Sequence, residues 1–251
     1  MSLRVEWSLA SLTWKLLLGR RRWLAIPICN GFPVFVSWIF IREEQDLRAA
    51  EALQFSQILM ATVVLSVLLP LASLIFGAMS MGQEIEDGTL AYSLAKPVAR
   101  WRLATTKVLV AWLATLATIL PGVWVAGWIV LGTPTHVLIE GFTLGLTVAA
   151  LLYVAGFMAL SLYTRRALIM GLLYVIGWEG SLSRLFDGTR TLSVREYATS
   201  IAQAVAGMRL GEGLASPLQP STSMILSVVL LSVLMGFAIS KLRKLELVEE
   251  V

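Results

Sequence analysis

The chain has 251 residues, of which 57% are hydrophobic and only 14% are charged, and its formal net charge is +4. Soluble domains contain about 45–50% apolar and about 25% charged residues, so this composition disfavours a soluble fold. The single cysteine, Cys29, excludes an intramolecular disulfide framework and a CxxC metal or redox site. The basic residues cluster beside apolar windows, as in membrane proteins, and we expect no nucleic-acid partner.

Five long uncharged windows predict helices that cross a membrane. They cover residues 23–41, 52–83, 108–139, 141–164 and 213–240, and they are 19, 32, 32, 24 and 28 residues long. A helix that crosses the hydrocarbon core of a bilayer needs about 20 apolar residues. We therefore expect an all-α integral membrane protein with the lipid bilayer as its surroundings, and a single transmembrane domain over residues 1–251.

The N-terminal residues 3–18 form an amphipathic pattern, with Trp7 and Trp14 on one side and Lys15 in a narrow polar stripe. Such a pattern predicts a helix lying in the membrane interface, and a disordered or soluble leader is the alternative. The arginines at 20–22 precede an apolar window longer than that of a signal peptide, so we expect no cleavage there.

Six spans are expected in chain order, at about 23–41, 56–80, 108–131, 140–163, 167–185 and 221–240. The first contains Pro27 and Pro33, which predict a kink. The fifth differs from the others because only 12 uncharged residues, 167–178, precede Glu179. It crosses only if the helix continues to about residue 185.

The distribution of basic residues favours six spans over five. With six spans, both termini, the loop at 81–107 and the turn at 164–166 share one side, which then carries 14 of the 20 Lys and Arg residues. Basic residues concentrate on the cytoplasmic side of membrane proteins. We therefore expect a multi-pass protein of the inner or plasma membrane, with both termini cytoplasmic and an outer segment at 186–220.

The polar segment 82–107 joins the second and third spans. Gly88 permits a break in the helix that leaves the second span. Leu90 and Leu94 lie on one face of a new helix, which Pro97 must end, so this helix has about two turns. Its candidate caps are Asp87 and Thr89, and its flanking charges are Glu84, Glu86 and Asp87 before it and Arg100 and Arg102 after it.

This segment resembles the type-2 ABC exporter permeases, which carry an acidic–GT–L…P–x–x–R…K pattern after the second span. The matching residues are Glu84, Asp87, Gly88, Thr89, Leu90, Leu94, Lys96, Pro97, Arg100 and Lys107. The resemblance extends to the six spans, the amphipathic N-terminal helix, the double-basic turn before the fifth span, the long outer segment after it and the pair Trp178–Glu179.

The resemblance implies the membrane-spanning permease subunit of an ATP-driven exporter, which forms the translocation pathway with a second permease subunit, identical or homologous. It implies that the short helix is a coupling helix that docks on a separate cytoplasmic ABC ATPase, which binds the ATP and Mg. The coupling residues would be Glu84, Glu86, Asp87, Gly88, Thr89, Leu90, Leu94, Pro97, Arg100 and Arg102. A solvated linker is the alternative for this segment.

Catalysis by this chain itself is not expected. None of its five lysines follows a glycine, so a Walker A loop is missing, and an ABC signature motif is missing as well. Residues 43–48 match the EExxxR pattern of prenyl-protein-processing membrane proteases, but such a protease needs several histidines and this chain has only His136. We expect no cofactor and no metal site; a non-transporting membrane subunit, such as a sensor partner or assembly factor, is the alternative function.

Glu179 is the acidic residue that the sequence places within or at the end of the fifth span. A charge at membrane depth is a functional candidate, which makes Glu179 a candidate pathway residue. Alternatively, it lies at the outer boundary, where it caps its own helix or pairs with Arg184. The sequence leaves both readings open.

Overall fold

The computed structural model describes residues 25–43, 48–86, 88, 99–164, 166–182, 191–208, 210–211 and 213–249. The regular structure of these residues is helical, without a strand, which confirms the expected all-α class. The expected interfacial helix at 3–18 lies outside the described residues. So do Asp87, Thr89, Leu90, Leu94 and Pro97 of the expected coupling helix.

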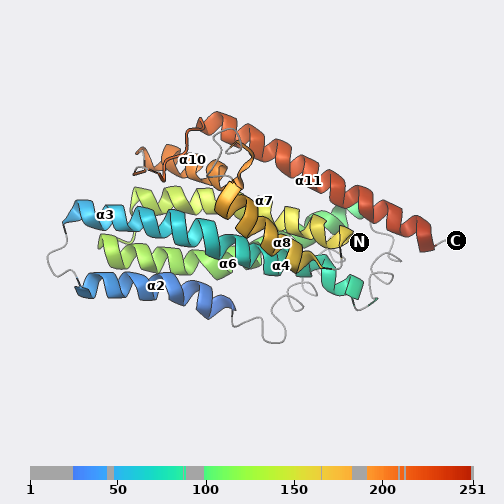
Figure 1. Ribbon diagram of the computed structural model, residues 1–251, viewed down its shortest axis with the longest axis horizontal. Helices are drawn as coiled ribbons and strands as arrows, with labels where there is room; N and C mark the ends of the chain where they lie inside the picture. The colour runs from blue at the N-terminus through green and yellow to red at the C-terminus, as the bar shows by residue number, and fades with distance from the viewer. Residues whose placement is uncertain are drawn as a thin grey trace, which may run out of the picture.

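The helices run along a common long axis and form a bundle (Figure 1). Its members are α2 (Ala25–Glu43), the continuous rod of α3 (Ala49–Ile58), η2 (Leu59–Leu68) and α4 (Leu69–Glu86), then α6 (Arg100–Leu131), α7 (Val137–Tyr163), α8 (Ala167–Tyr174), η3 (Val175–Leu182), α10 (Val194–Ala206) and α11 (Pro220–Glu249). The segments η2 and η3 are π-helical. Both continue an α-helix without a break in the chain.

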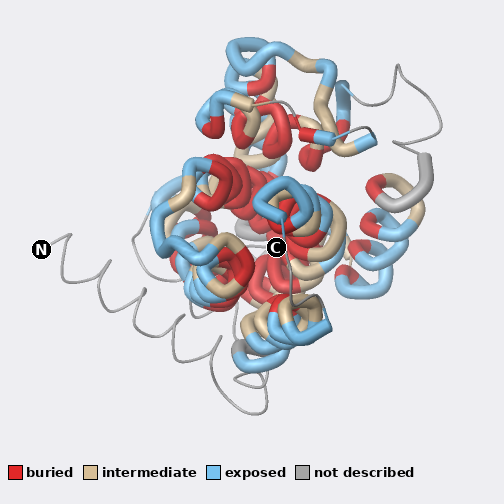
Figure 2. Tube along the Cα trace, turned by 90° about the vertical axis from the view of Figure 1, so that its left-hand side faces the viewer, coloured by how far each residue is buried: buried red, intermediate tan, exposed pale blue. Residues whose placement is uncertain are grey.

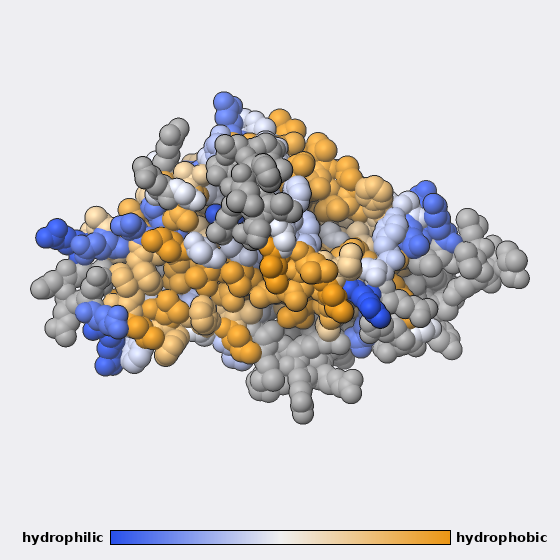
Figure 3. Space-filling view, in the orientation of Figure 1, coloured by the Kyte–Doolittle hydropathy of each residue, from blue (hydrophilic) through white to orange (hydrophobic). Residues whose placement is uncertain are grey.

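Four of the described helices are long and apolar enough to cross a membrane, namely Ala49–Ile85, Arg100–Leu131, Val137–Tyr163 and Pro220–Lys244. A shorter apolar helix covers Ala167–Glu179. The chain is therefore a membrane protein with several spans, and six spans stay a prediction. Figure 3 shows a broad apolar band around the middle of the molecule, with hydrophilic residues gathered toward its two ends.

Helix α7 is the centre of the bundle, because α4, α6, α10 and α11 all pack against it. Buried residues lie mostly on the inner sides of the helices and exposed residues on the outer sides (Figure 2). Many of those exposed residues are large and apolar, especially on α8 and α11. An exposed apolar surface of this size marks contact with lipid or with another membrane subunit.

Helices α2 and α6 approach closely around a proline. Pro121 lies inside α6 and has no amide hydrogen to donate. The next amide, that of Gly122, donates to Oδ1 of Asn30 in α2 at 2.5 Å. A Cβ atom added to Gly122 would lie 2.7 Å from the Cα atom of Asn30, so only glycine permits this approach.

Helix α10 packs along the first half of α7 through small residues. A Cβ atom on Gly141 would lie 2.5 Å from the carbonyl oxygen of Ala202, and one on Gly145 would clash with the carbonyl oxygen of Ala198. Small residues four apart let two helix backbones come this close. Because 141 meets 202 and 145 meets 198, the helices are antiparallel, and Val194 lies nearest the middle of α7.

The sequence predicts an outer segment over residues 186–220, and its side of the membrane stays a prediction. Part of that range, α10, lies beside the membrane-crossing helix α7 and covers its glycine-lined face. The fifth crossing, expected as one helix over about 167–185, begins as α8 and η3, which the structure describes to Leu182. Helix α10 then runs from the middle of α7 toward the residue at which α7 begins.

Candidate functional site: a buried ion pair beneath the coupling segment

The segment that the sequence assigns to coupling starts and ends on two neighbouring helices of the bundle. Helix α4 ends at Glu86, and Gly88 follows with φ of 67°, a left-handed conformation that favours glycine. The expected helix break at Gly88 is therefore confirmed. Helix α6 begins at Arg100 after the N-cap residue Ala99. Since α4 and α6 pack against each other, both ends of the segment lie on one unit.

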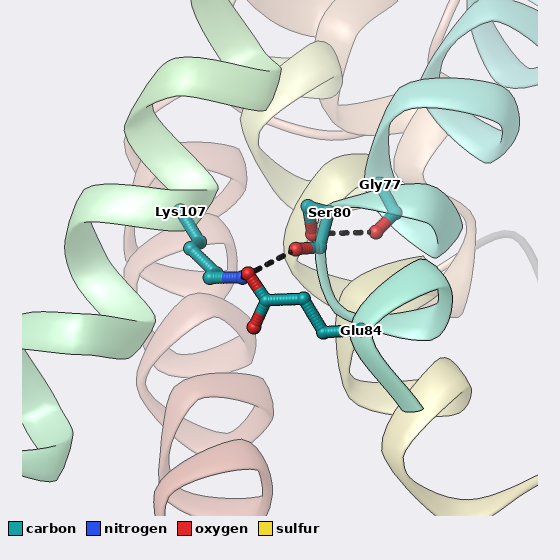
Figure 4. Close-up of polar contacts among 4 residues, drawn as sticks. All are labelled: Gly77, Ser80, Glu84 and Lys107. Carbon is teal, nitrogen blue, oxygen red and sulfur yellow. Dashed lines mark hydrogen bonds and ion pairs between the residues drawn. The ribbon is translucent and has the colours of Figure 1, made fainter. Parts of the chain in front are cut away.

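An ion pair joins these two helices close to the residues at which the segment starts and ends. The Nζ atom of Lys107 in α6 lies 2.5 Å from Oε1 of Glu84 in α4. The same Nζ donates a hydrogen bond to the carbonyl oxygen of Ser80 at 2.9 Å, and the Ser80 hydroxyl donates to the Gly77 carbonyl oxygen at 2.7 Å. Figure 4 shows Lys107 reaching across from α6 to Glu84 and Ser80 on the last turns of α4.

Because its side chains are largely buried, this ion pair strongly opposes separation of α4 and α6. The Lys107 side chain is only 3% exposed and that of Glu84 is 15% exposed. A charge removed from water is costly unless it is paired and hydrogen-bonded. Lys107 has both a carboxylate and a carbonyl oxygen as acceptors, so its position is stable only while α4 and α6 stay together.

The predicted coupling charges lie in different surroundings in the structure. Glu84 faces Lys107 inside the bundle. Arg100 is half-buried in the first turn of α6, and Arg102 is exposed with its guanidinium 5.2 Å from the ring of Trp101. Glu86 belongs to the last turn of α4, and its side chain is outside the described residues.

The partnership of Lys107 with Glu84 was not predicted from the sequence, although a signal for it exists. Lys107 recurs at helical spacing with Leu103, Ala111 and Ala114, which are all buried. A lysine on the buried face of a helix requires a nearby anion or a route to water. Glu84 and Glu86 are the acidic residues at the facing end of α4, and Glu84 is the one that pairs with Lys107.

Glu179 is a second buried charge, far along the bundle from the first. Its side chain is 1% exposed. Its carboxylate accepts hydrogen bonds from the Ser193 hydroxyl at 2.7 Å, from the Val194 amide at 3.1 Å and from the Tyr174 hydroxyl at 3.4 Å. Ser193 is the N-cap of α10 and Val194 its first residue, so Glu179 caps α10 and joins it to η3.

The structure places Glu179 beside the middle of α7. Tyr153, near the middle of α7, lies beside the carboxylate. The carboxylate caps α10, and the position of Glu179 relative to the outer membrane boundary stays a prediction. Arg184 lies outside the described residues. A role in the pathway stays a prediction.

A family model described as ABC-2 family transporter protein matches residues 25–165, more than half of the chain. The match runs from α2 to the turn after α7 and includes both helices of the ion pair. The chain therefore belongs to the ABC-2 family of transporter proteins, which confirms the resemblance found at residues 84–107.

Members of this family are the permease subunits of ABC transporters, typically non-catalytic, and they normally work with an ABC ATPase partner. No curated protein matches the chain. Within the described residues, His, Cys, Asp and Glu side chains form no group of three that could hold a metal ion.

We predict that the substitutions Lys107→Met and Glu84→Leu are strongly non-additive. Either one alone removes one partner of a buried pair, which costs roughly 3–5 kcal/mol, whereas an apolar pair of similar size recovers most of this loss. Thermal unfolding of the purified protein in detergent measures the loss of stability in each variant. Arg102→Met is the control, because the side chain of Arg102 is exposed. Additive losses in the double variant would show that the two side chains do not stabilise each other.

We predict that Glu179→Gln loosens α10. A glutamine side chain has one acceptor oxygen, so either the Ser193 hydroxyl or the Val194 amide loses its partner, at a cost of roughly 1–3 kcal/mol. Hydrogen exchange of the α10 amides should then accelerate about fivefold to about 150-fold. The control is Glu140→Gln, an exposed carboxylate at the start of α7. Equal exchange in the two variants would contradict the capping role.

Proposed function

We propose that the chain is the permease subunit of an ATP-driven exporter in the cell membrane, coupled to a separate ABC ATPase through the segment 82–107. Family membership supports the transporter class. The observation that carries the coupling proposal is the buried pair of Glu84 and Lys107 at the base of that segment.

The segment needs a partner surface for a physical reason. An isolated helix of about two turns is marginal in water, because nucleation of a helix is costly. Leu90 and Leu94 offer an apolar stripe to bury, which is worth roughly 1.5–3 kcal/mol for each leucine. The charges at Arg100 and Arg102 can orient the docked ATPase through complementary charges. A docked ATPase thus stabilises the helix and holds it firmly.

Motion of the docked segment then passes to two helices at once. The segment leaves α4 after Glu86 and enters α6 at Arg100, and the pair of Lys107 with Glu84 ties these helices in the last turn of α4 and the first two turns of α6. A displacement imposed by the ATPase therefore moves α4 and α6 together. Helix α7, which packs against both, carries the displacement into the rest of the bundle.

The translocation pathway is proposed to lie between two permease subunits. The interior of the single bundle is filled by packed apolar side chains, such as Phe76, Phe142 and Met158. Large exposed apolar residues on α2 offer a surface that a second subunit can cover. The basic residues Lys241, Arg243 and Lys244 at the end of α11 support cytoplasmic termini.

We predict that Leu90→Asp combined with Leu94→Asp releases the ATPase and abolishes transport, while insertion into the membrane stays normal. Two charges on the apolar stripe remove its burial energy and repel the partner surface. Co-purification with the ATPase in mild detergent is the measurement, with Val137→Asp as the control, an exposed apolar residue at the opposite end of the bundle. Retention of the ATPase by the double variant would refute the coupling assignment, and loss of transport with the ATPase retained would favour another defect.

A further inference from the structure

A cavity of about 250 Å³ lies between the end of α4 and the turn that joins α7 to α8. It is separate from the ion pair, since Glu84 and Lys107 do not line it. One part of its wall is polar and includes Gln83, Thr164 and Arg166. The other part is apolar and includes Met79 and Ile169. Such a mixed wall suits an amphiphile better than a small polar ion.

The charge of the cavity selects for an anion. Arg166 is the only ionisable side chain among the described residues that line it. Its side chain is exposed, so its guanidinium is accessible to a ligand. Its amide donates to the Thr164 hydroxyl at 3.2 Å, which holds the backbone of the turn beside the cavity. A guanidinium binds phosphate groups bidentately and with specificity.

The cavity lies where α7 and α8 meet the membrane boundary. Helix α7 ends at Tyr163, whose ring lies 5.1 Å from the Nζ atom of Lys241 in α11. Tyrosine and lysine are the residue types that anchor helices at the level of lipid headgroups. The turn at 164–166 follows directly, so Arg166 lies at headgroup level, beside the apolar part of the bundle.

An apolar stripe continues from the cavity along α8. Ile169, Leu173 and Ile176 recur at helical spacing after Arg166 and are 58%, 62% and 61% exposed. Ile169 itself lines the cavity. A headgroup held at Arg166 therefore has a surface for its acyl chain directly above it.

We propose that this cavity binds the headgroup of an anionic phospholipid from the bilayer, with the phosphate on Arg166 and an acyl chain along Ile169 and Leu173. The site requires neither the ATPase nor a transported substrate, so it is independent of the proposed coupling. Basic pockets between membrane helices are known to take anionic headgroups in this way.

Native mass spectrometry of the purified chain tests the proposal, with phosphatidylglycerol and phosphatidylcholine as the titrated lipids. We expect phosphatidylglycerol to bind at least tenfold more tightly, Arg166→Gln to remove this preference, and binding of phosphatidylcholine to stay unchanged. Arg243→Gln is the control, because it removes an exposed arginine from α11 at the same end of the bundle.

A second arm distinguishes a lipid site from a free-anion site. Inorganic phosphate and glycerol 3-phosphate carry the headgroup chemistry without acyl chains, so neither should displace phosphatidylglycerol at millimolar concentration. Ile169→Ser should weaken phosphatidylglycerol binding without restoring competition by phosphate. Equal affinity for the two lipids, full binding by Arg166→Gln, or displacement by inorganic phosphate would each overturn the proposal.

Discussion

The buried ammonium group of Lys107 is the constraint on which the cytoplasmic end of this bundle, as we propose it, depends. A side chain that is 3% exposed and charged is stable only with an anion at contact distance, and Glu84 supplies that anion from α4. The two helices that border the coupling segment are therefore tied to each other before any partner binds. If the segment couples to an ATPase as we propose, a displacement of the segment moves α4 and α6 together instead of bending one helix relative to the other.

A second buried ionisable group, the carboxylate of Glu179, lies in the middle of the bundle and also needs polar partners there. Glu179 is satisfied by donors from Ser193 and Val194, which fixes where α10 begins. Glycines at 141 and 145 then let α10 lie directly against α7. Because α7 also packs against α4 and α6, one central helix connects both buried charges.

The sequence predicts the fold class well because its signals are local. Long uncharged windows indicate membrane helices, and Gly88 indicates the end of α4. The pairing of Lys107 with Glu84 is not local, since it depends on how two helices rotate about their axes. For Glu179, the sequence offers two readings because its donors, Ser193 and Val194, come from a later helix. The short uncharged run before Glu179 did signal that the fifth crossing differs from the others.

The most direct test of this mechanism is to join α4 and α6 covalently at the ion pair. Glu84→Cys and Lys107→Cys would be introduced in a Cys29→Ser background and bridged in the reconstituted complex with its ATPase by a short bis-methanethiosulfonate, which forms a disulfide with each cysteine and releases methanesulfinate. If the two helices move as one unit, the bridged complex should hydrolyse ATP and transport at rates within about twofold of the unbridged complex. Transport that is lost on bridging and recovered on reduction would show that α4 and α6 must separate, which contradicts the mechanism.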